Sequence, residues 1–117
     1  MKSLITRSKS VLVVCDLQER FRTLITGFPA VVESTRVLIE ACRLHKIPIV
    51  VTEQYPKAFG ATVPELGLDR ERDLFVSKTQ FSVLVPEVKE FLDRLCPEHV
   101  FLTGIEVGLS SQAILIL

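Results

Sequence analysis

An α/β fold, in which helices cover a parallel sheet, is the class that this sequence predicts. Residues 11–14 form a continuous apolar run rich in β-branched side chains, which is typical of a strand buried on both faces. Similar runs return later in the chain, and segments with helical spacing of apolar residues separate them. Because strand, helix and strand follow each other in this order, parallel pairing is the default.

The first predicted strand ends directly before an acidic residue, Asp16. In open sheets of this class, ligands bind just beyond the carboxyl ends of the strands. Asp16 is therefore a candidate for chemistry. An aspartate at this position is equally suited to capping the turn that follows, and this stretch alone favours neither role.

Two helices are predicted between strands. Residues 30–45 carry apolar residues at helical spacing, and Pro29 before them suits a first helical turn. Residues 83–95 show the same pattern, with Ser82 as a suitable cap and Pro97 as a stop. Both segments are long enough to connect parallel strands.

Apolar runs at residues 47–52, 74–78 and 99–103 are the remaining predicted strands. The segment between the second and third contains glycine and proline and is expected to be a surface loop, and the charged residues 70–73 within it a solvated turn. A last helix is predicted at residues 112–117, where every side chain after the first is apolar. Such a segment needs a partner surface.

Composition argues against several functional classes. The 14 basic and 14 acidic residues balance, so there is no basic excess for nucleic acid, and no apolar stretch is long enough to span a membrane. Cys15, Cys42 and Cys96 are odd in number and match no zinc motif, and His45 and His99 stand alone. We therefore expect no metal, no cofactor, reduced thiols and a cytoplasmic protein.

The first nine residues carry three basic side chains and several hydroxyls before the first strand. We expect residues 1–9 to be a flexible N-terminus. A mitochondrial transit peptide is the alternative that such a composition leaves open.

Three strand ends carry residues that could act together. Asp16 follows the first strand, Lys78 ends the third predicted strand and residues 104–111 form a turn that leads to a helix start. Parallel strands bring their carboxyl ends to one edge, so these groups can converge. An acid, a lysine and a nucleophile at a helix start make a hydrolytic set, because the helix N-terminus favours negative charge.

Five ordered blocks carry a family resemblance. They are Val-Cys-Asp-Leu-Gln-Glu-Arg-Phe at 14–21, Thr-Glu-Gln-Tyr-Pro at 52–56, Val-Pro-Glu-Leu-Gly at 63–67, Lys-Thr-Gln-Phe-Ser at 78–82 and Leu-Thr-Gly-Ile-Glu at 102–106. Together they resemble the isochorismatase-like cysteine hydrolase superfamily, in its branch of isochorismatase domain-containing proteins.

The resemblance implies a three-layer α/β/α, Rossmann-like isochorismatase fold with a six-stranded, mostly parallel sheet. Family members continue beyond the point where this chain ends, so residues 10–117 are expected to form a partial domain, incomplete at the C-terminus. The resemblance also implies small-molecule substrates and leaves homo-oligomers open as an assembly.

The resemblance further implies a catalytic Asp-Lys-Cys triad. Its aspartate maps onto Asp16 and its lysine onto Lys78, whereas the position of the cysteine holds Ser110. Phe21, Gln54 and Tyr55 are candidates for substrate contact, with packing or turn roles as alternatives. A cis peptide that is frequent in the family would fall near Glu106 and Val107 and would indicate an oxyanion site, which makes these two residues candidates for substrate binding.

The serine leads to three hypotheses about function. The first is a hydrolase of small amides or vinyl ethers with impaired turnover, because a hydroxyl is far less acidic than a thiol. The second is a non-catalytic family member that binds a small molecule or a protein through the same cleft. The third is a truncated isoform without activity of its own.

Overall fold

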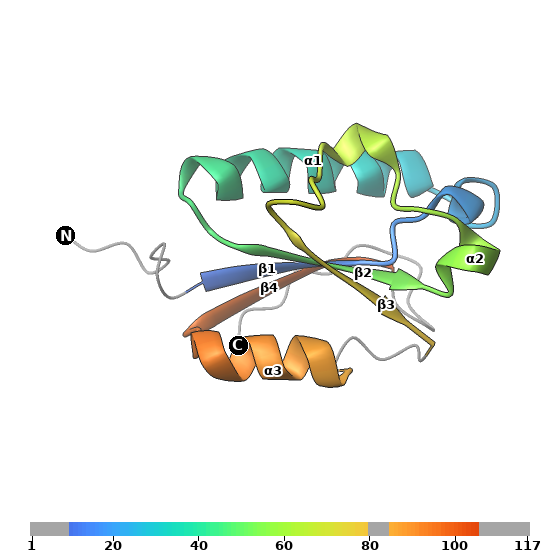
Figure 1. Ribbon diagram of the computed structural model, residues 1–117. Coiled ribbons are helices and arrows are strands. Elements are labelled where there is room, and N and C mark those ends of the chain that lie inside the picture. The colour runs from blue at the N-terminus through green and yellow to red at the C-terminus, as the bar shows by residue number, and fades with distance from the viewer. Residues whose placement is uncertain (1–9, 80–84, 106–117) are drawn as a thin grey trace.

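The computed structural model describes residues 10–79 and 85–105. Within these residues, one sheet of parallel strands has the order β3-β2-β1-β4 (Figure 1). Its strands are β1 (Ser10–Cys15), β2 (Ile49–Gln54), β3 (Leu74–Lys78) and β4 (His99–Gly104). The α/β class and the parallel sheet predicted from the sequence are confirmed. The helix expected at 112–117 lies outside the described residues.

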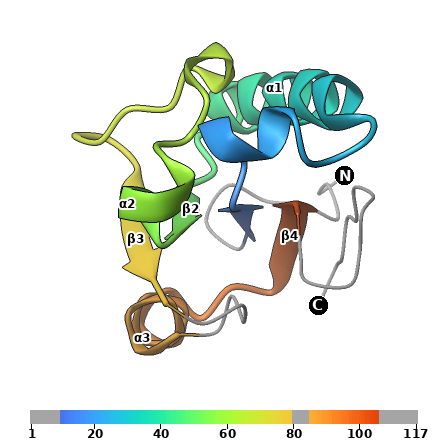
Figure 2. The ribbon, with the colours of Figure 1, turned by 90° about the vertical axis from the view of Figure 1, so that its right-hand side faces the viewer.

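Helices lie on both faces of this sheet and complete three layers. Helix α1 (Phe28–Leu44) covers one face and α3 (Pro86–Leu95) the other, as Figures 1 and 2 show from two directions. The short α2 (Pro56–Phe59) follows β2 at the carboxyl edge of the sheet. No helix in the described ranges combines the length and apolarity needed to cross a membrane.

Strand β1 is the centre of the core. Its six residues are all buried, and their side chains alternate between the two faces. Leu12 and Val14 join the cluster beneath α1, while Val11, Val13 and Cys15 join the cluster that α3 covers. The continuous apolar run is therefore explained by helices on both faces.

The second strand runs further than its apolar residues suggested. It begins at Ile49, after Pro48, and ends at Gln54 instead of residue 52. Glu53 and Gln54 pair with Ser77 and Lys78 of β3, and both are about 2% exposed. Two polar side chains at the end of β2 are thus held inside the fold.

The prediction of a solvated turn at residues 70–73 is wrong for Asp73. Its side chain is 1% exposed, and both carboxylate oxygens accept hydrogen bonds from Arg43 at 2.6 Å. The backbone N–H of Asp69 donates a further bond at 2.9 Å. Residues 70–72 are exposed as predicted, and the Arg70 guanidinium lies 4.2 Å from the centre of the Phe75 ring.

Gly104 ends β4 and lies beside Cys15, the last residue of β1. Its φ is +120°, which L-side chains rarely adopt, and a Cβ here would overlap the carbonyl oxygen of Cys15 and lie 2.8 Å from its nitrogen. The next residue, Ile105, donates its N–H to the same carbonyl at 2.9 Å. Only glycine allows the chain to leave β4 in this direction.

Replacing Gly104 by alanine should destabilise the fold severely. We expect Gly104→Ala to lower the free energy of unfolding by at least about 3 kcal/mol. Alanine is strained at this φ, and the backbone must also move to make room for the new Cβ. Gly67→Ala is the matched control, since Gly67 has a φ of +68° with nothing within 4 Å of a new Cβ. It should cost only about 1 kcal/mol. Equal losses in urea denaturation would contradict the close-approach argument.

Candidate active site

Three neighbouring strands bring polar side chains together at the carboxyl edge of the sheet. Asp16 follows β1, Gln54 ends β2 and Lys78 ends β3. The Lys78 ammonium crosses the end of β2 and donates to Asp16 Oδ2 at 2.9 Å and to Gln54 Oε1 at 3.1 Å. The sequence-predicted convergence of Asp16 and Lys78 is therefore observed, although the two residues are 62 positions apart.

The Asp16 carboxylate is held by side chains. Thr52 donates its hydroxyl to Asp16 Oδ1 at 2.8 Å, so each carboxylate oxygen has a donor. The backbone of Asp16 has a φ of +55°, a conformation that aspartate tolerates better than most residues. Among the described residues its side-chain partners are Thr52 and Lys78, which favours the chemical role of Asp16 over a turn cap.

Burial dominates the electrostatics of this pair. The Asp16 side chain is 7% exposed and that of Lys78 is 1% exposed. Burial raises the pKa of the Asp16 carboxyl above its ordinary value, and the nearby charge of Glu53 adds to this, while the hydrogen bonds from Lys78 and Thr52 oppose it. A carboxyl with a raised pKa is suited to accept and return a proton.

Gln18 is a site residue that sequence reasoning missed. Its side chain is fully buried and makes two hydrogen bonds to the backbone of Gln54, as a neighbouring strand would. Gln18 Oε1 accepts the N–H of Gln54 at 2.7 Å, and Gln18 Nε2 donates to the carbonyl of Gln54 at 2.9 Å. The same amide donates to the carbonyl of Gly60 at 2.8 Å. Gln18 thereby fixes the backbone of Gln54, whose side chain contacts Lys78.

Glu53 is a second missed residue, and it fastens the loop after β2 to the sheet. Its Oε2 accepts from the backbone N–H and the hydroxyl of Thr62, each at 2.8 Å, and both oxygens lie 3.1 Å from Arg70. Burial alone would raise the pKa of Glu53, but these bonds together lower it below its usual value. Its signal in the sequence was an acid directly after an apolar strand.

The remaining substrate-contact candidates lie around this edge. Phe21, in a short 3-10 helix (Glu19–Arg22), stacks on Phe59 with ring centres 5.1 Å apart. Tyr55 follows β2 and is 49% exposed, so its ring is free to contact a ligand. Glu106, Val107 and Ser110 lie outside the described residues. Their roles remain predictions from the resemblance.

The three cysteines have separate environments. Cys15 packs into the core on the α3 side, and Cys96 is exposed just after α3. Cys42 is buried in α1, and burial raises the pKa of its thiol to about 11. No group of three or more potential metal ligands is found within residues 10–79 and 85–105.

Comparison with known proteins identifies the class to which this fold and site belong. Residues 10–110 match the family model described as the isochorismatase domain. The match spans most of the chain and includes Asp16, Gln54 and Lys78. The chain therefore belongs to the isochorismatase family.

Curated relatives of the chain share one name. Isochorismatase domain-containing protein 2 of Danio rerio is 45% identical over 98 residues, which are 83% of this chain and 49% of that protein. The protein of the same name in Homo sapiens is also 45% identical, over 83% of this chain and 46% of its own length. The chain spans about half the length of these relatives.

Solved structures show the same fold. The MAR1 ribonuclease from Caenorhabditis elegans superposes with a TM-score of 0.76 at 41% identity, covering 89% of this chain and 54% of the other. An isochorismatase from Pseudomonas putida superposes with a TM-score of 0.75 at 18% identity, covering 90% of this chain and 60% of the other. The second likeness concerns the fold alone.

Removing the Asp16 charge should leave Lys78 as a poorly compensated buried cation. We expect Asp16→Asn, which suits the same backbone conformation, to lower the free energy of unfolding by about 3 kcal/mol. Adding Lys78→Met should restore part of the loss, because the buried charge is removed. Urea denaturation of the two variants tests this. A double variant less stable than Asp16→Asn would contradict it.

The lowered pKa of Glu53 makes its contribution depend on pH. A carboxyl whose pKa is lower in the folded chain than in the unfolded chain stabilises the fold above the unfolded value, here about 4.5, and loses this effect as the pH falls through the folded value. At pH 7 we expect Glu53→Gln to be about 2 kcal/mol less stable than wild type.

This difference should shrink progressively below pH 4.5, and urea denaturation between pH 3 and 7 measures it. Glu40→Gln is the control, because Glu40 is 67% exposed and pairs with Arg36 at the surface. It should change stability by less than about 0.5 kcal/mol at every pH. A constant difference for Glu53→Gln would show that its charge is not what holds the loop.

Proposed function

We propose that the carboxyl edge of this sheet is a small-molecule site of the isochorismatase hydrolase type, in which Asp16 moves the proton and Lys78 supplies the compensating charge. The observation that carries the proposal is the buried contact of 2.9 Å between these two side chains. Gln54 adds an amide to the same site, and its oxygen is 3.1 Å from the ammonium. The family match supports a hydrolytic ancestry.

The substrate we propose is a small amide or vinyl ether, the substrate class that the family resemblance suggests. One solved relative is named a ribonuclease. The present chain has 14 basic and 14 acidic residues, and RNA binding depends on an excess of basic side chains that attract the phosphates. Charge balance therefore favours a small molecule over RNA.

We further propose that turnover is impaired, because Ser110 stands where the family resemblance places a cysteine. The nucleophile of such a site must lose its proton, and a hydroxyl holds its proton far more tightly than a thiol. Loss of a catalytic nucleophile costs about 10⁶ in turnover in a hydrolase where it has been measured.

The second candidate function is binding without turnover. The serine at position 110 supports it, because a hydroxyl is a poor nucleophile, while the contacts among Asp16, Lys78 and Gln54 that would hold a ligand are present. Isothermal titration with unreactive amides tests for binding. Both candidate functions require that such amides bind, whereas a chain with neither function should not bind them. A homo-oligomeric assembly also stays a proposal, which light scattering can test.

Restoring the thiol should restore chemistry. We expect Ser110→Cys, made in a Cys96→Ser background to remove the exposed thiol, to hydrolyse at least one member of a panel of small amides and vinyl ethers at least about 100-fold faster than wild type. Adding Asp16→Asn should abolish the gain. Wild-type turnover that survives Ser110→Ala would rule out the serine as nucleophile.

A readout that needs no substrate accompanies this test. The introduced thiol should react with iodoacetamide at pH 7 about tenfold faster than an ordinary exposed thiol, because the positive charge of Lys78 lowers its pKa. Lys78→Met should remove the acceleration. Ordinary reactivity in both proteins would contradict the placement of Ser110 beside Asp16 and Lys78.

A further inference from the structure

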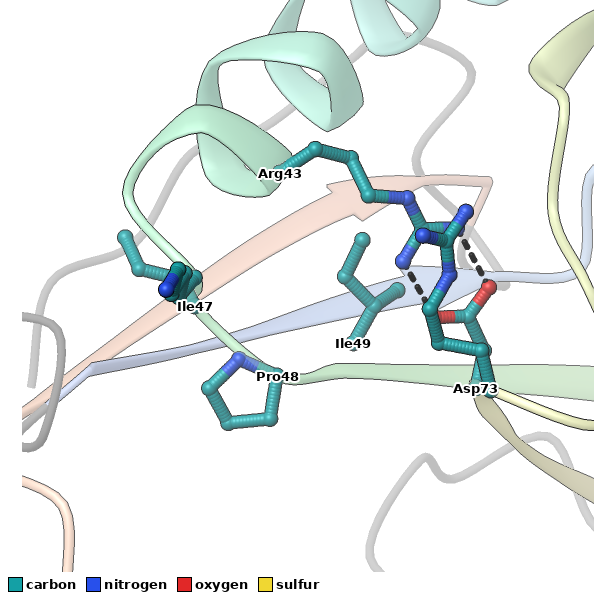
Figure 3. A pocket seen from close by; sticks show the side chains of 7 residues that line it. Arg43, Ile47, Pro48, Ile49 and Asp73 are labelled. Carbon is teal, nitrogen blue, oxygen red and sulfur yellow. Dashed lines mark hydrogen bonds and ion pairs between the residues drawn. The ribbon is translucent and has the colours of Figure 1, made fainter.

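A pocket lies at the edge of the sheet opposite the candidate active site, where β2 begins (Figure 3). Its volume is about 240 Å³, and it is bounded by the last turn of α1, residues 46–49 and the segment before β3. Ile49 and Gln54 are the first and last residues of β2. At the usual rise of a strand, the pocket is about 16 Å from the candidate active site, so it is a separate site.

One wall of the pocket is a structural ion pair. Arg43 and Asp73 face each other in Figure 3, and two hydrogen bonds of 2.6 Å join guanidinium and carboxylate. Asp73 also accepts the N–H of Asp69 at 2.9 Å. Its negative charge is thus compensated within the fold and opposes an incoming anion only weakly.

Two further cations line the pocket, and the charge of one of them, Arg72, helps to lower the pKa of Asp73 without a direct contact. Lys46 and Arg72 are exposed, and within the described residues neither side chain makes a hydrogen bond or an ion pair. By contrast, Arg22, Arg36 and Arg70 each pair with a glutamate. Among the lining residues the three cations outnumber the one carboxylate by two, and the nearby Asp69, whose charge acts on Arg43, offsets part of this surplus.

The nearby end of α1 does not cancel this surplus. A helix C-terminus carries partial negative charge on its last carbonyl groups. Here the chain satisfies these groups itself: the carbonyls of Ala41, Cys42 and Arg43 accept the N–H groups of His45, Ile47 and Lys46 at 3.2, 2.8 and 3.1 Å. The negative end of the helix is therefore covered by the backbone that follows it.

The remaining lining is apolar. Ile47, Pro48 and Ile49 lie together at the start of β2 in Figure 3, and Pro48 is the more exposed of the three. Proline also lacks an N–H group, so the side chains of this part of the lining offer a ligand hydrophobic contact. The pocket thus combines an apolar surface with two exposed cations that make no ion pair in the described part of the chain.

We propose that this pocket binds a small organic dianion, a phosphate monoester with a compact apolar group. Its phosphate lies between Lys46 and Arg72, where two negative charges neutralise the two surplus positive ones. Its apolar group lies against Pro48 and the neighbouring isoleucines. The site is independent of the chemistry at Asp16 and Lys78.

Phenyl phosphate is the probe, and amide NMR shifts of the isotope-labelled chain are the measurement. We expect saturable shifts in residues 43–49 and 70–73, with millimolar affinity. Inorganic phosphate should bind at least fivefold more weakly, because it lacks the apolar group. Binding should weaken at least threefold between pH 7.5 and 5, since the monoester loses its second charge near pH 6. Equal affinity for inorganic phosphate would overturn the proposal.

Substitution of the two cations tests the same site directly. Arg72→Gln should weaken phenyl phosphate at least threefold, and the double change Lys46→Gln with Arg72→Gln at least tenfold. Arg94→Gln is the matched control, because it removes one exposed positive charge from α3 on the other face of the sheet. Unchanged affinity in the double variant, or shifts confined to residues around Asp16 and Lys78, would overturn the proposal.

Discussion

The ion pair between Asp16 and Lys78 is the constraint around which the carboxyl edge of this sheet is built. Each partner is more than nine-tenths buried, so neither charge is tolerable without the other. The pair spans the end of β2, and it therefore requires β1 and β3 to flank β2 in the observed order. Thr52 and Gln54 satisfy the remaining polar atoms from that central position.

The polar contacts around the ion pair attach the loop after β2 to the carboxyl edge of the sheet. Gln18 holds the backbone of Gln54 and reaches Gly60, while Glu53 holds Thr62 and Arg70. These contacts tie the loop after β2 to the sheet from two sides. A loop that carries Tyr55 and Phe59 is thereby fixed relative to the ion pair, which is the requirement for a site that positions a ligand.

Local patterns in the sequence predicted the strands, the helices and the meeting of Asp16 with Lys78, because apolar periodicity and parallel connection are properties of short segments. They did not predict that Glu53 and Gln54 belong to β2, or that Asp73 is buried. Those outcomes depend on partners 9 to 36 residues away, Thr62, Gln18 and Arg43. A polar residue in a sequence is predicted to be exposed, because the distant residue that would pair with it in the interior cannot be identified from neighbouring positions.

The ion pair has a structural role that does not depend on catalysis. A buried lysine needs a carboxylate whether or not the protein turns over a substrate, since removing one partner costs about 3–5 kcal/mol. The fold therefore needs Asp16 and Lys78 together in an active and in an inactive site alike. Under the function proposed above, the residue that decides between hydrolysis and binding is Ser110, which stands where the family resemblance places a cysteine.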